Sequence, residues 1–539
     1  MQPRDPRRLE SEPFDVAVIG GGIYGLALAY EAASRGLRTG LVEASDFGGG
    51  VSFNHQKTAH GGLRSLQSGR LDRARESIRE RRALARIAPR FLRPLPFLVG
   101  TYPSLTRNRF ALQAAFLVDR IVGADRNDGV ATELHLPAAR LVSRERAREI
   151  FPDIAPQGLS GGAVWYDYQM TANDRLTLAF AAAADQAGAV LVNYAEATDA
   201  IREGRRIAGL VATDRLTGRK LALRASLTIN AAGGQAGRVM ALFGVDRPFP
   251  LVRVMSLMTS RPARDHALAA PDRAGRMLTL VPWRDCALVG TSHSDRFVTS
   301  DDVNEKRAQV ERFISEATVA FPSLQLTRDC VTLVHEGLVP GAVGRGGRPD
   351  LKPSHEILDH SADGAPGAMT VVSVKYTTAR GVAEHAITAV GSLLRRQLAP
   401  SRTASVPLPG AEAGDHTHLV TDAVRRHQIE LSPQVIARLA SLYGRHAGAV
   451  VDLTADAPAL REAIEPASPV IGAEVVHAIR NEMAVRLSDI VLRRMAFSAR
   501  HPSASFLEAC AKVAAAELQW TEEERRAQVA EVDAVFDVP

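Results

Sequence analysis

The feature that most constrains this chain is a glycine-rich turn near its N-terminus. Residues 14–25 read FDVAVIGGGIYG, which places Gly20, Gly22 and Gly25 in a GxGxxG pattern between an apolar run and a helix-compatible stretch. In such a turn the first glycine permits the tight bend, the second lets a pyrophosphate approach the backbone, and the third lets the helix pack closely on the strand. The start of the helix supplies unpaired N–H groups to phosphate. The pattern predicts a dinucleotide site.

An acidic residue follows this turn at the expected spacing. Residues 23–35 suit a helix, and residues 39–43 form an apolar stretch that ends at Glu43. Together they predict a βαβ unit in which Glu43 accepts hydrogen bonds from a ribose. The alternative is a glycine-rich turn that binds nothing, and the complete βαβ unit argues against it. The turn alone does not distinguish a nicotinamide cofactor from a flavin.

A second segment distinguishes the two cofactors. Residues 57–64 read KTAHGGLR, shortly after Glu43. With residues 20–43 they resemble the flavin-dependent glycerol-3-phosphate dehydrogenase family, whose motif reads approximately SSxxSKxxHGGLRYL after the dinucleotide fingerprint. The matching residues are Ser52, Lys57, His60, Gly61, Gly62, Leu63, Arg64 and Leu66. The departures are Phe53, His55 and Ser65, and Ser65 stands where the family has tyrosine.

Further segments extend the resemblance over most of the chain. They are residues 166–167 (YD), 173–176 (NDRL), 230–233 (NAAG), 281–283 (VPW), 290–292 (GTS), 375–380 (KYTTAR) and the stretch 473–494. The resemblance implies an α/β fold with a Rossmann-like FAD-binding domain, an antiparallel-sheet substrate domain and a C-terminal helical domain. With 539 residues, 46% of them hydrophobic, the chain is long enough for several cores.

These landmarks predict domain boundaries. We expect the FAD-binding domain in three parts, the substrate domain in two and the helical domain in one. The FAD-binding parts are residues 1–105, 160–250 and 335–405, the substrate parts are a cap insertion at 106–159 and a sheet at 251–334, and the helical domain is 406–539.

The resemblance also implies roles for individual residues. FAD is the expected cofactor, and the chemistry is hydride transfer to flavin N5 from a C–H that bears a hydroxyl or an amine, while a protein base takes the proton. The expected catalytic residues are His60, Arg64 and Lys375. The expected cofactor-binding residues are Gly20, Gly22, Gly25, Glu43, Ser52, Lys57, His60, Gly61, Gly62, Leu63, Ala197, Gly233, Thr377 and Thr378.

Some of these roles have alternatives. Thr377 and Thr378 are expected to open a helix whose N-terminus faces the flavin, although simple N-capping would account for them equally. Arg64 and Lys375 are expected to orient an anionic substrate, and a structural ion pair is the alternative for each. Other candidate bases are His293 and His335.

The substrate is less constrained than the cofactor. Where the family has an AGxRP segment, residues 336–340 read EGLVP, so Val339 replaces an arginine, and two glycines that precede the family's lysine are missing before Lys375. Arg253, Arg345 and Arg348 are candidates to compensate. Glycerol 3-phosphate is the leading substrate by resemblance. The alternatives are a divergent enzyme for another polyol, hydroxy acid or amine, and a non-catalytic flavin-binding or scaffold protein.

Bulk properties limit the partners. The net charge of +6 is spread along the chain and offset by 60 acids, so we expect no nucleic-acid partner, and intrahelical ion pairs should account for the arginine-rich run 70–93. Three widely spaced cysteines predict reduced thiols and no metal site. Without a long apolar run or a secretory signal, we expect a cytoplasmic protein. The electron acceptor stays open between quinone, oxygen and a soluble carrier, as do peripheral membrane contact and homo-oligomerisation.

Overall fold

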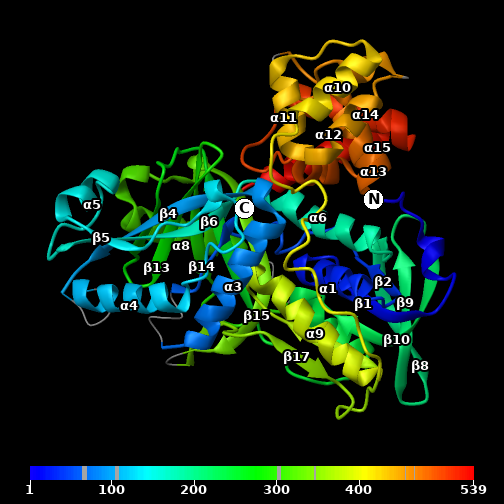
Figure 1. Ribbon diagram of the computed structural model, residues 1–539, viewed down its shortest axis with the longest axis horizontal. Coiled ribbons are helices and arrows are strands. Elements are labelled where there is room, and N and C mark those ends of the chain that lie inside the picture. Colours follow the sequence, from blue (N-terminus) through cyan, green and yellow to red (C-terminus); the bar gives the residue numbers. More distant parts are fainter. Residues whose placement is uncertain (64–68, 104–107, 300–304, 345–346, 456, 467) are drawn as a thin grey trace.

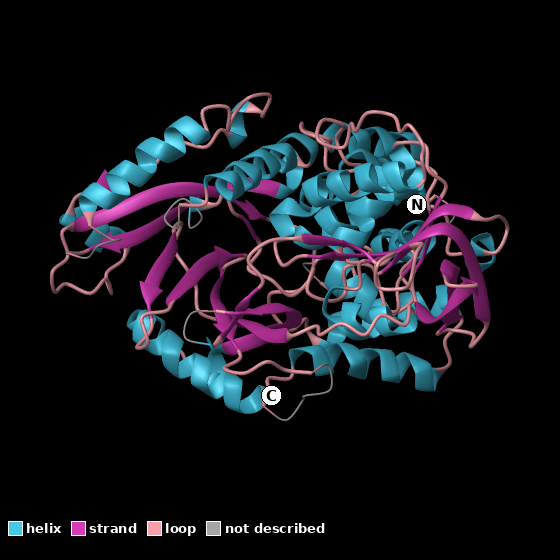
Figure 2. Cartoon of the chain, turned by 90° about the horizontal axis from the view of Figure 1, so that it is seen from below, coloured by secondary structure: helices cyan, strands magenta, loops and turns pink. Residues whose placement is uncertain are grey.

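A computed structural model describes residues 1–63, 69–103, 108–299, 305–344, 347–455, 457–466 and 468–539. The molecule is built around two β-sheets, and a group of helices near the C-terminus packs on the second of them (yellow to red in Figure 1). Figure 2 shows how helices and strands are distributed in a view turned by 90°. The expected α/β fold with a helical C-terminal part is confirmed.

The first sheet has a parallel centre in the strand order β18-β10-β1-β2-β7, with antiparallel β17 beside β18. Its strands are β1 (Phe14–Ile19), β2 (Thr39–Val42), β7 (Val190–Val192), β10 (Lys220–Asn230), β17 (Glu356–Asp359) and β18 (Ala368–Val372). The chain leaves the middle strand β1 through the glycine turn and returns through α1 (Ile23–Ser34) to β2. This is the predicted βαβ unit.

The two faces of this sheet are covered differently. Val16 and Val18 of β1 join the core under α1, α6 (Asn173–Gln186) and α9 (Ala379–Leu393). Ala17 and Ile19 point to the opposite face, as the period of a strand requires. There they pack against an antiparallel unit made by β8 (Ala195–Glu203), β9 (Arg206–Asp214) and the first half of β10.

The second sheet has ten strands in the order β16-β15-β11-β14-β13-β12-β4-β6-β3, with β5 beside β6. Its strands are β3 (Thr58–Ala59), β4 (Leu92–Thr101), β5 (Arg140–Val142), β6 (Gly161–Met170), β11 (Leu251–Thr259), β12 (Ala267–Pro271), β13 (Met277–Trp283), β14 (Cys286–His293), β15 (Val331–Val343) and β16 (Pro349–Leu351). Leu257 packs under α8 (Lys306–Ala320), whereas Trp283 on the opposite face packs against C-terminal helices.

This topology places five strands differently from the predicted domain boundaries. β3, β4, β6, β16 and the whole of β15 belong to the second sheet, although residues 1–105, 160–250 and 335–405 were expected to build the FAD-binding domain. An apolar strand reads the same in either sheet, because its neighbours are chosen by long-range pairing. The second sheet therefore takes strands from all three of those segments.

The C-terminal helices are α10 (Thr417–His427), α11 (Pro433–Tyr443), α12 (Ala447–Asp452), α13 (Gly472–Glu482), α14 (Ala504–Leu518) and α15 (Glu522–Phe536). α13 ends at Glu482, and its C-cap Met483 has a φ of +56°. A π-helical turn, η11 (Asp489–Arg494), follows. The buried Asp489 carboxylate accepts the backbone N–H groups of Val485 and Arg486 at 3.0 Å each, and these bonds hold the chain in a turn.

The arginine-rich helix α3 (Leu71–Ile87) differs from expectation in its partners. Glu80 forms a buried ion pair with Arg380 at 2.6 Å, and Arg82 binds Asp125 at 2.5 Å. Its main ion pairs therefore reach other elements, and the prediction of intrahelical pairs was wrong. Sequence spacing shows which charges lie on one helix face but not what lies opposite them.

Among the described residues, no helix is both long enough and apolar enough to cross a membrane. Cys286, Cys330 and Cys510 are buried free thiols. Within the same residues, no group of His, Cys, Asp and Glu is arranged to hold a metal ion.

Candidate functional site

The glycine turn has little room for larger residues. Gly20 has a φ of +108°, and a Cβ there would lie 2.7 Å from the carbonyl oxygen of Ala231. A Cβ on Gly25 would overlap the carbonyl oxygen of Gly20. Gly22 is the N-cap of α1 and makes no side-chain capping bond. The turn thus keeps β1, α1 and the start of the loop that follows β10 in close contact.

Ser52 lies at the start of α1, as a phosphate ligand would. Its hydroxyl accepts the N–H of Ile23 at 2.9 Å, in the first turn of the helix. A Cβ on Gly22 would lie 3.2 Å from the same hydroxyl oxygen. The structure therefore brings Ser52 and the glycine turn to one place.

Glu43 is folded back on the turn. Its Oε2 accepts the N–H of Gly21 at 2.5 Å, and its Oε1 accepts the N–H and the hydroxyl of Ser45 at 2.8 and 2.9 Å. Its backbone oxygen accepts the N–H of Ala195, at the start of the strand that carries Ala197. A ribose hydroxyl bound here would share the Glu43 carboxylate with these donors.

Lys57 is fully buried and does not face open space. Its Nζ donates to the carbonyl oxygen of Phe53 and lies 4.8 Å from the centre of the Phe53 ring and 5.5 Å from that of Trp283. Burial lowers the pKa of Lys57 to about 8, although Asp174 opposes the shift. These contacts anchor the loop that contains Lys57 and Phe53.

His60 is half exposed and held by a carboxylate. Its Nδ1 lies 3.1 Å from Asp167 Oδ2, and its backbone N–H donates to Thr377 Oγ1 at 3.2 Å. Asp167 also accepts the N–H of Gly61 at 2.7 Å and an ion pair from Arg81. Burial alone would raise the pKa of Asp167, but the hydrogen bond from His60 and the charge of Arg81 hold it below its ordinary value. Asp167 thereby fixes the His60 ring.

The segment around Lys375 reaches the glycine turn through Tyr24, which sequence reasoning missed. The Tyr24 hydroxyl, at the start of α1, donates to the carbonyl oxygen of Lys375 at 2.6 Å and lies 3.3 Å from Thr378 Oγ1. Thr377 and Thr378 end a short 3₁₀ turn directly before α9. Burial lowers the pKa of Lys375, while Glu76 opposes the shift. The predicted residues His60, Lys375, Thr377 and Thr378 therefore lie together beside α1.

The other predicted residues have diverse surroundings. Gly62 has a φ of +83° and lies against α3, and Leu63 packs on a small apolar cluster under α4 (Arg109–Val122). Gly233 opens the turn after β10, with a φ of +56° and no atom within 4 Å of a Cβ built on it. Ala197 is buried in β8. Arg64 and Ser65 lie outside the described residues.

Two buried histidines lie beside the same loop. His55 stacks on Tyr376 with 4.9 Å between ring centres, and His335 Nδ1 lies 3.0 Å from Asn54 Oδ1. Burial holds the pKa of both histidines well below its ordinary value. The Nε2 atom of each is buried without a partner, which is unusual unless a bound group satisfies it.

These features fit a flavin dinucleotide. The glycine turn and Ser52 lie at a helix N-terminus, where a phosphate group would find unpaired N–H donors. The unpartnered Nε2 atoms of His55 and His335 would be available to hydrogen-bond with a bound group. Gly233 leaves backbone open beside the turn.

Of the expected replacements for the missing arginine, Arg253 lies beside an acid and Arg348 is exposed. Val339 is buried in β15, and the Arg253 Nε lies 3.4 Å from Glu336 Oε1. Lys306 Nζ lies 2.9 Å from the other oxygen of Glu336. Arg345 lies outside the described residues.

A cavity of about 570 Å³ lies where the first sheet, β15 and the C-terminal helices meet. Its lining includes Asp46, Tyr194, Glu336, Leu338, Arg486 and Arg493. It joins the loop after Glu43 to the helical domain.

Comparisons with known proteins cover nearly the whole chain. The sequence model of a family described as FAD dependent oxidoreductase matches residues 15–390, and one described as the C-terminal domain of alpha-glycerophosphate oxidase matches residues 401–525. A glycerol-3-phosphate dehydrogenase from Synechocystis is 31% identical over 507 residues, which cover 91% of this chain and 90% of that protein. One from Mycobacterium leprae is 30% identical, covering 98% of this chain and 88% of that protein.

A solved structure shares the fold. The glycerol-3-phosphate dehydrogenase from Bacillus halodurans, complexed with FAD, superposes with a TM-score of 0.75 at 24% identity. The likeness covers 98% of this chain and 95% of that one.

Proposed function

Because the chain belongs to the family of FAD-dependent oxidoreductases, we propose that it oxidises glycerol 3-phosphate at the C–H that bears the secondary hydroxyl. The observation that carries the proposal is the cluster beside the glycine turn, where Asp167 holds His60 and His60 holds Thr377. Relatives with this activity in their names match the chain over nine-tenths of its length or more. Bound FAD would accept the hydride.

The chain's own residues would hold FAD along α1. The N-terminus of α1, with Gly22 and Ser52, would bind the pyrophosphate, and Glu43 would bind the ribose. The start of α9, at Thr377 and Thr378, would place backbone N–H groups and the positive end of a helix dipole beside the ring.

His60 is the proposed proton acceptor. Because Nδ1 faces the Asp167 carboxylate, the proton of a neutral imidazole rests on Nδ1, and Nε2 is left with its lone pair. A substrate hydroxyl bound at Nε2 would give up its proton there. Lys375 and Arg64 would attract and orient the phosphate.

A divergent substrate is the second candidate. Val339 is buried and apolar where the family has an arginine, and Arg253 is already paired with Glu336. Each missing charge-assisted hydrogen bond would remove about 1.5–3 kcal/mol of phosphate binding. The missing arginine favours another polyol, hydroxy acid or amine as the substrate. The complete His60 cluster argues against a non-catalytic protein.

The test is anaerobic bleaching of the flavin absorption. Glycerol 3-phosphate should bleach it at lower concentration than glycerol, which is the matched control without phosphate. A panel of hydroxy acids, other polyols and amines tests the second candidate, a divergent substrate. Bleaching by a panel member but not by glycerol 3-phosphate would contradict the leading substrate, and no bleaching by any reductant of the panel would support the non-catalytic alternative.

We further propose that the protein is cytoplasmic and contacts an anionic membrane through α4, where a quinone could accept the electrons. Phe110 is 85% exposed and Ile121 is 69% exposed on this helix, and Leu71 of α3 is exposed nearby. An amphipathic helix of this kind binds membrane interfaces, and the net positive charge of the protein favours anionic lipid.

Vesicle binding tests this contact. Sedimentation with vesicles of anionic lipid should decrease in a Phe110→Ser, Ile121→Ser double variant. If that variant sediments like the parent, the membrane contact is wrong. If the double substitution instead changes the oligomeric state measured by light scattering, the face binds a second copy of the chain.

A further inference from the structure

The loop after Glu43 is held by the C-terminal helical domain. Asp46 is only 1% exposed. Its carboxylate accepts hydrogen bonds from the Nε of Arg493 at 2.5 Å and from the Nη2 of Arg494 at 2.8 Å. The second terminal nitrogen of Arg494 binds the same carboxylate. Both arginines belong to the η11 turn, more than 440 residues away along the chain. A residue of the cofactor loop is thus fixed by another domain.

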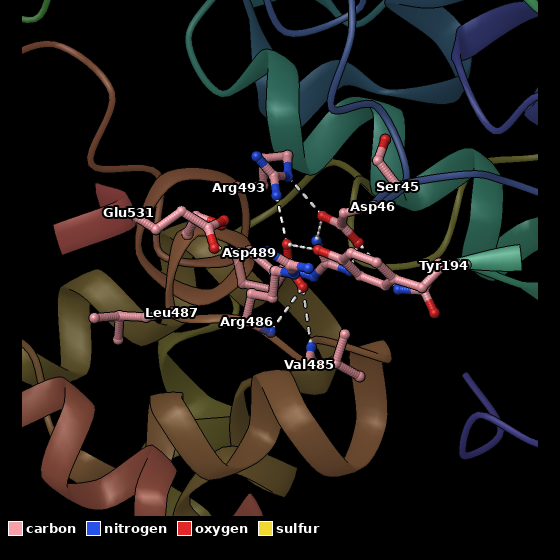
Figure 3. A network of polar contacts seen from close by, with 12 residues as sticks. Ser45, Asp46, Tyr194, Val485, Arg486, Leu487, Asp489, Arg493 and Glu531 are labelled. Carbon is pink, nitrogen blue, oxygen red and sulfur yellow. Dashed lines mark hydrogen bonds and ion pairs between the residues drawn. The ribbon is translucent and has the colours of Figure 1, made fainter. Parts of the chain in front are cut away.

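A second connection runs through Tyr194. Its backbone N–H donates to the carbonyl oxygen of Ser45 at 2.9 Å, and its hydroxyl donates to Asp489 Oδ1 at 2.8 Å. Figure 3 shows these side chains converging, with Arg493 bound to both Asp46 and Asp489. The η11 turn therefore holds both the side chain of Asp46 and, through Tyr194, the backbone of the loop.

The charges of the network balance. Two buried carboxylates, Asp46 and Asp489, face the buried guanidinium group of Arg494 and the partly buried one of Arg493. Burial would raise the pKa of Asp46, but the two arginines hold it below its ordinary value. Burial and the nearby Asp46 charge raise the pKa of Asp489. Removing one member would leave an uncompensated buried charge, which is far more costly than losing an exposed pair.

Ser45 links this network to Glu43. The N–H and hydroxyl of Ser45 both bind Glu43 Oε1, and Ser45 directly precedes Asp46. If Asp46 leaves the arginines, Ser45 moves with it and releases Glu43, which also binds the glycine turn at Gly21.

We propose that Arg493 and Arg494 are positioning residues for FAD, which act through Asp46 and Ser45 on Glu43. FAD binding and docking of the η11 turn are then coupled, and the coupling is reciprocal: each stabilises the other. The inference rests on the proposed placement of FAD along α1. It gives the C-terminal domain a part in binding the cofactor as well as a structural part.

The experiment measures release of FAD from the full-length holoprotein on dilution, followed by the fluorescence of free FAD. The variants are Asp46→Asn, which keeps the volume of the side chain, and Arg494→Met. The control is Arg480→Met, which breaks a pair with Glu517 between α13 and α14, inside the helical domain and away from the η11 turn. Both test variants should raise the dissociation constant for FAD about tenfold or more, as expected for coupled sites, and the control should leave it unchanged.

Hydrogen exchange supplies a readout that a general loss of stability would not reproduce. In the parent protein FAD should slow exchange across residues 485–495, and in Asp46→Asn this protection should be lost. Unchanged FAD affinity in Asp46→Asn, or an equal loss in Arg480→Met, would overturn the proposal. If Arg494→Met does not fold, Asp46→Asn decides alone. Because no substrate is used, failure of glycerol 3-phosphate to bleach the flavin would leave this result untouched.

Discussion

Asp167 holds His60 by its Nδ1 at 3.1 Å, although 107 residues separate them along the chain. The carboxylate comes from a strand of the second sheet, and the histidine comes from the loop that follows the first βαβ unit. The imidazole is therefore oriented from the second sheet, while the backbone N–H of His60 donates to Thr377, directly before α9.

This pair predicts a linked loss of activity. In Asp167→Asn the amide can donate to Nδ1 and stabilise the wrong tautomer, so the anaerobic rate of flavin reduction should fall about 10²-fold or more. His60→Gln should lose a similar factor. The double variant should lose little beyond either single variant, because the two residues act as a unit. Losses that multiply would show that Asp167 acts separately from His60.

The glycine turn predicts a sharp contrast between two alanine substitutions. In Gly25→Ala the new Cβ would overlap the Gly20 carbonyl oxygen, so the protein should purify without flavin absorption or fail to fold. The control is Gly50→Ala, in the loop that follows β2, where a Cβ meets no atom within 4 Å. Gly50→Ala should keep its flavin. A yellow Gly25→Ala protein would contradict the tight approach of α1 to the strand.

The buried pair of Glu80 and Arg380 predicts a large stability loss. Both side chains are at most 3% exposed, so Arg380→Met leaves a buried carboxylate and should lower the free energy of unfolding by about 3–5 kcal/mol. The exposed pair of Arg146 and Glu149 is the control, and Arg146→Met should change stability by less than about 1 kcal/mol. Urea unfolding of the flavin-free proteins measures both. Equal effects would mean that the α3 to α9 contact opens readily.

Lys57 predicts a pH dependence of stability. In the folded protein the pKa of Lys57 is about 8, below the ordinary value of 10.5 that it takes in the unfolded chain. Between pH 8 and pH 10.5 the unfolded chain therefore binds more protons than the folded one. The contribution of Lys57 to stability therefore rises with pH across this window, by at most about 3 kcal/mol. Lys57→Met should lack this rise. The difference between the two unfolding curves measured from pH 7 to 11 isolates the effect, and parallel curves would contradict it.

Local rules made the first part of the site predictable. The spacing of Gly20, Gly22 and Gly25 is dictated by contacts within one βαβ unit, so the turn, α1 and β2 lie where the pattern placed them. The start of α9 after Thr378 follows from a similarly local signal. What the sequence could not show were partners from distant segments, such as the Tyr24 hydroxyl on the Lys375 carbonyl oxygen.

Long-range pairing also explains the errors. The charges of α3 look self-sufficient on a helical wheel, but Glu80 finds Arg380 three hundred residues later. β15 reads as an apolar strand suited to either sheet, and only its pairing with β11 decides. The break after α13 depends on Asp489 reaching back to two backbone N–H groups, which helical periodicity does not reveal.

Trp283 and Leu288 of the second sheet share one core with Val475 and Leu507 of the final helices. A shortened chain that stops in the linker near residue 400 would present this aromatic and aliphatic surface to water, and it should aggregate rather than survive as a smaller oxidoreductase. A protein with this fold but without the last domain must therefore bury this sheet face in another way, or carry polar side chains there.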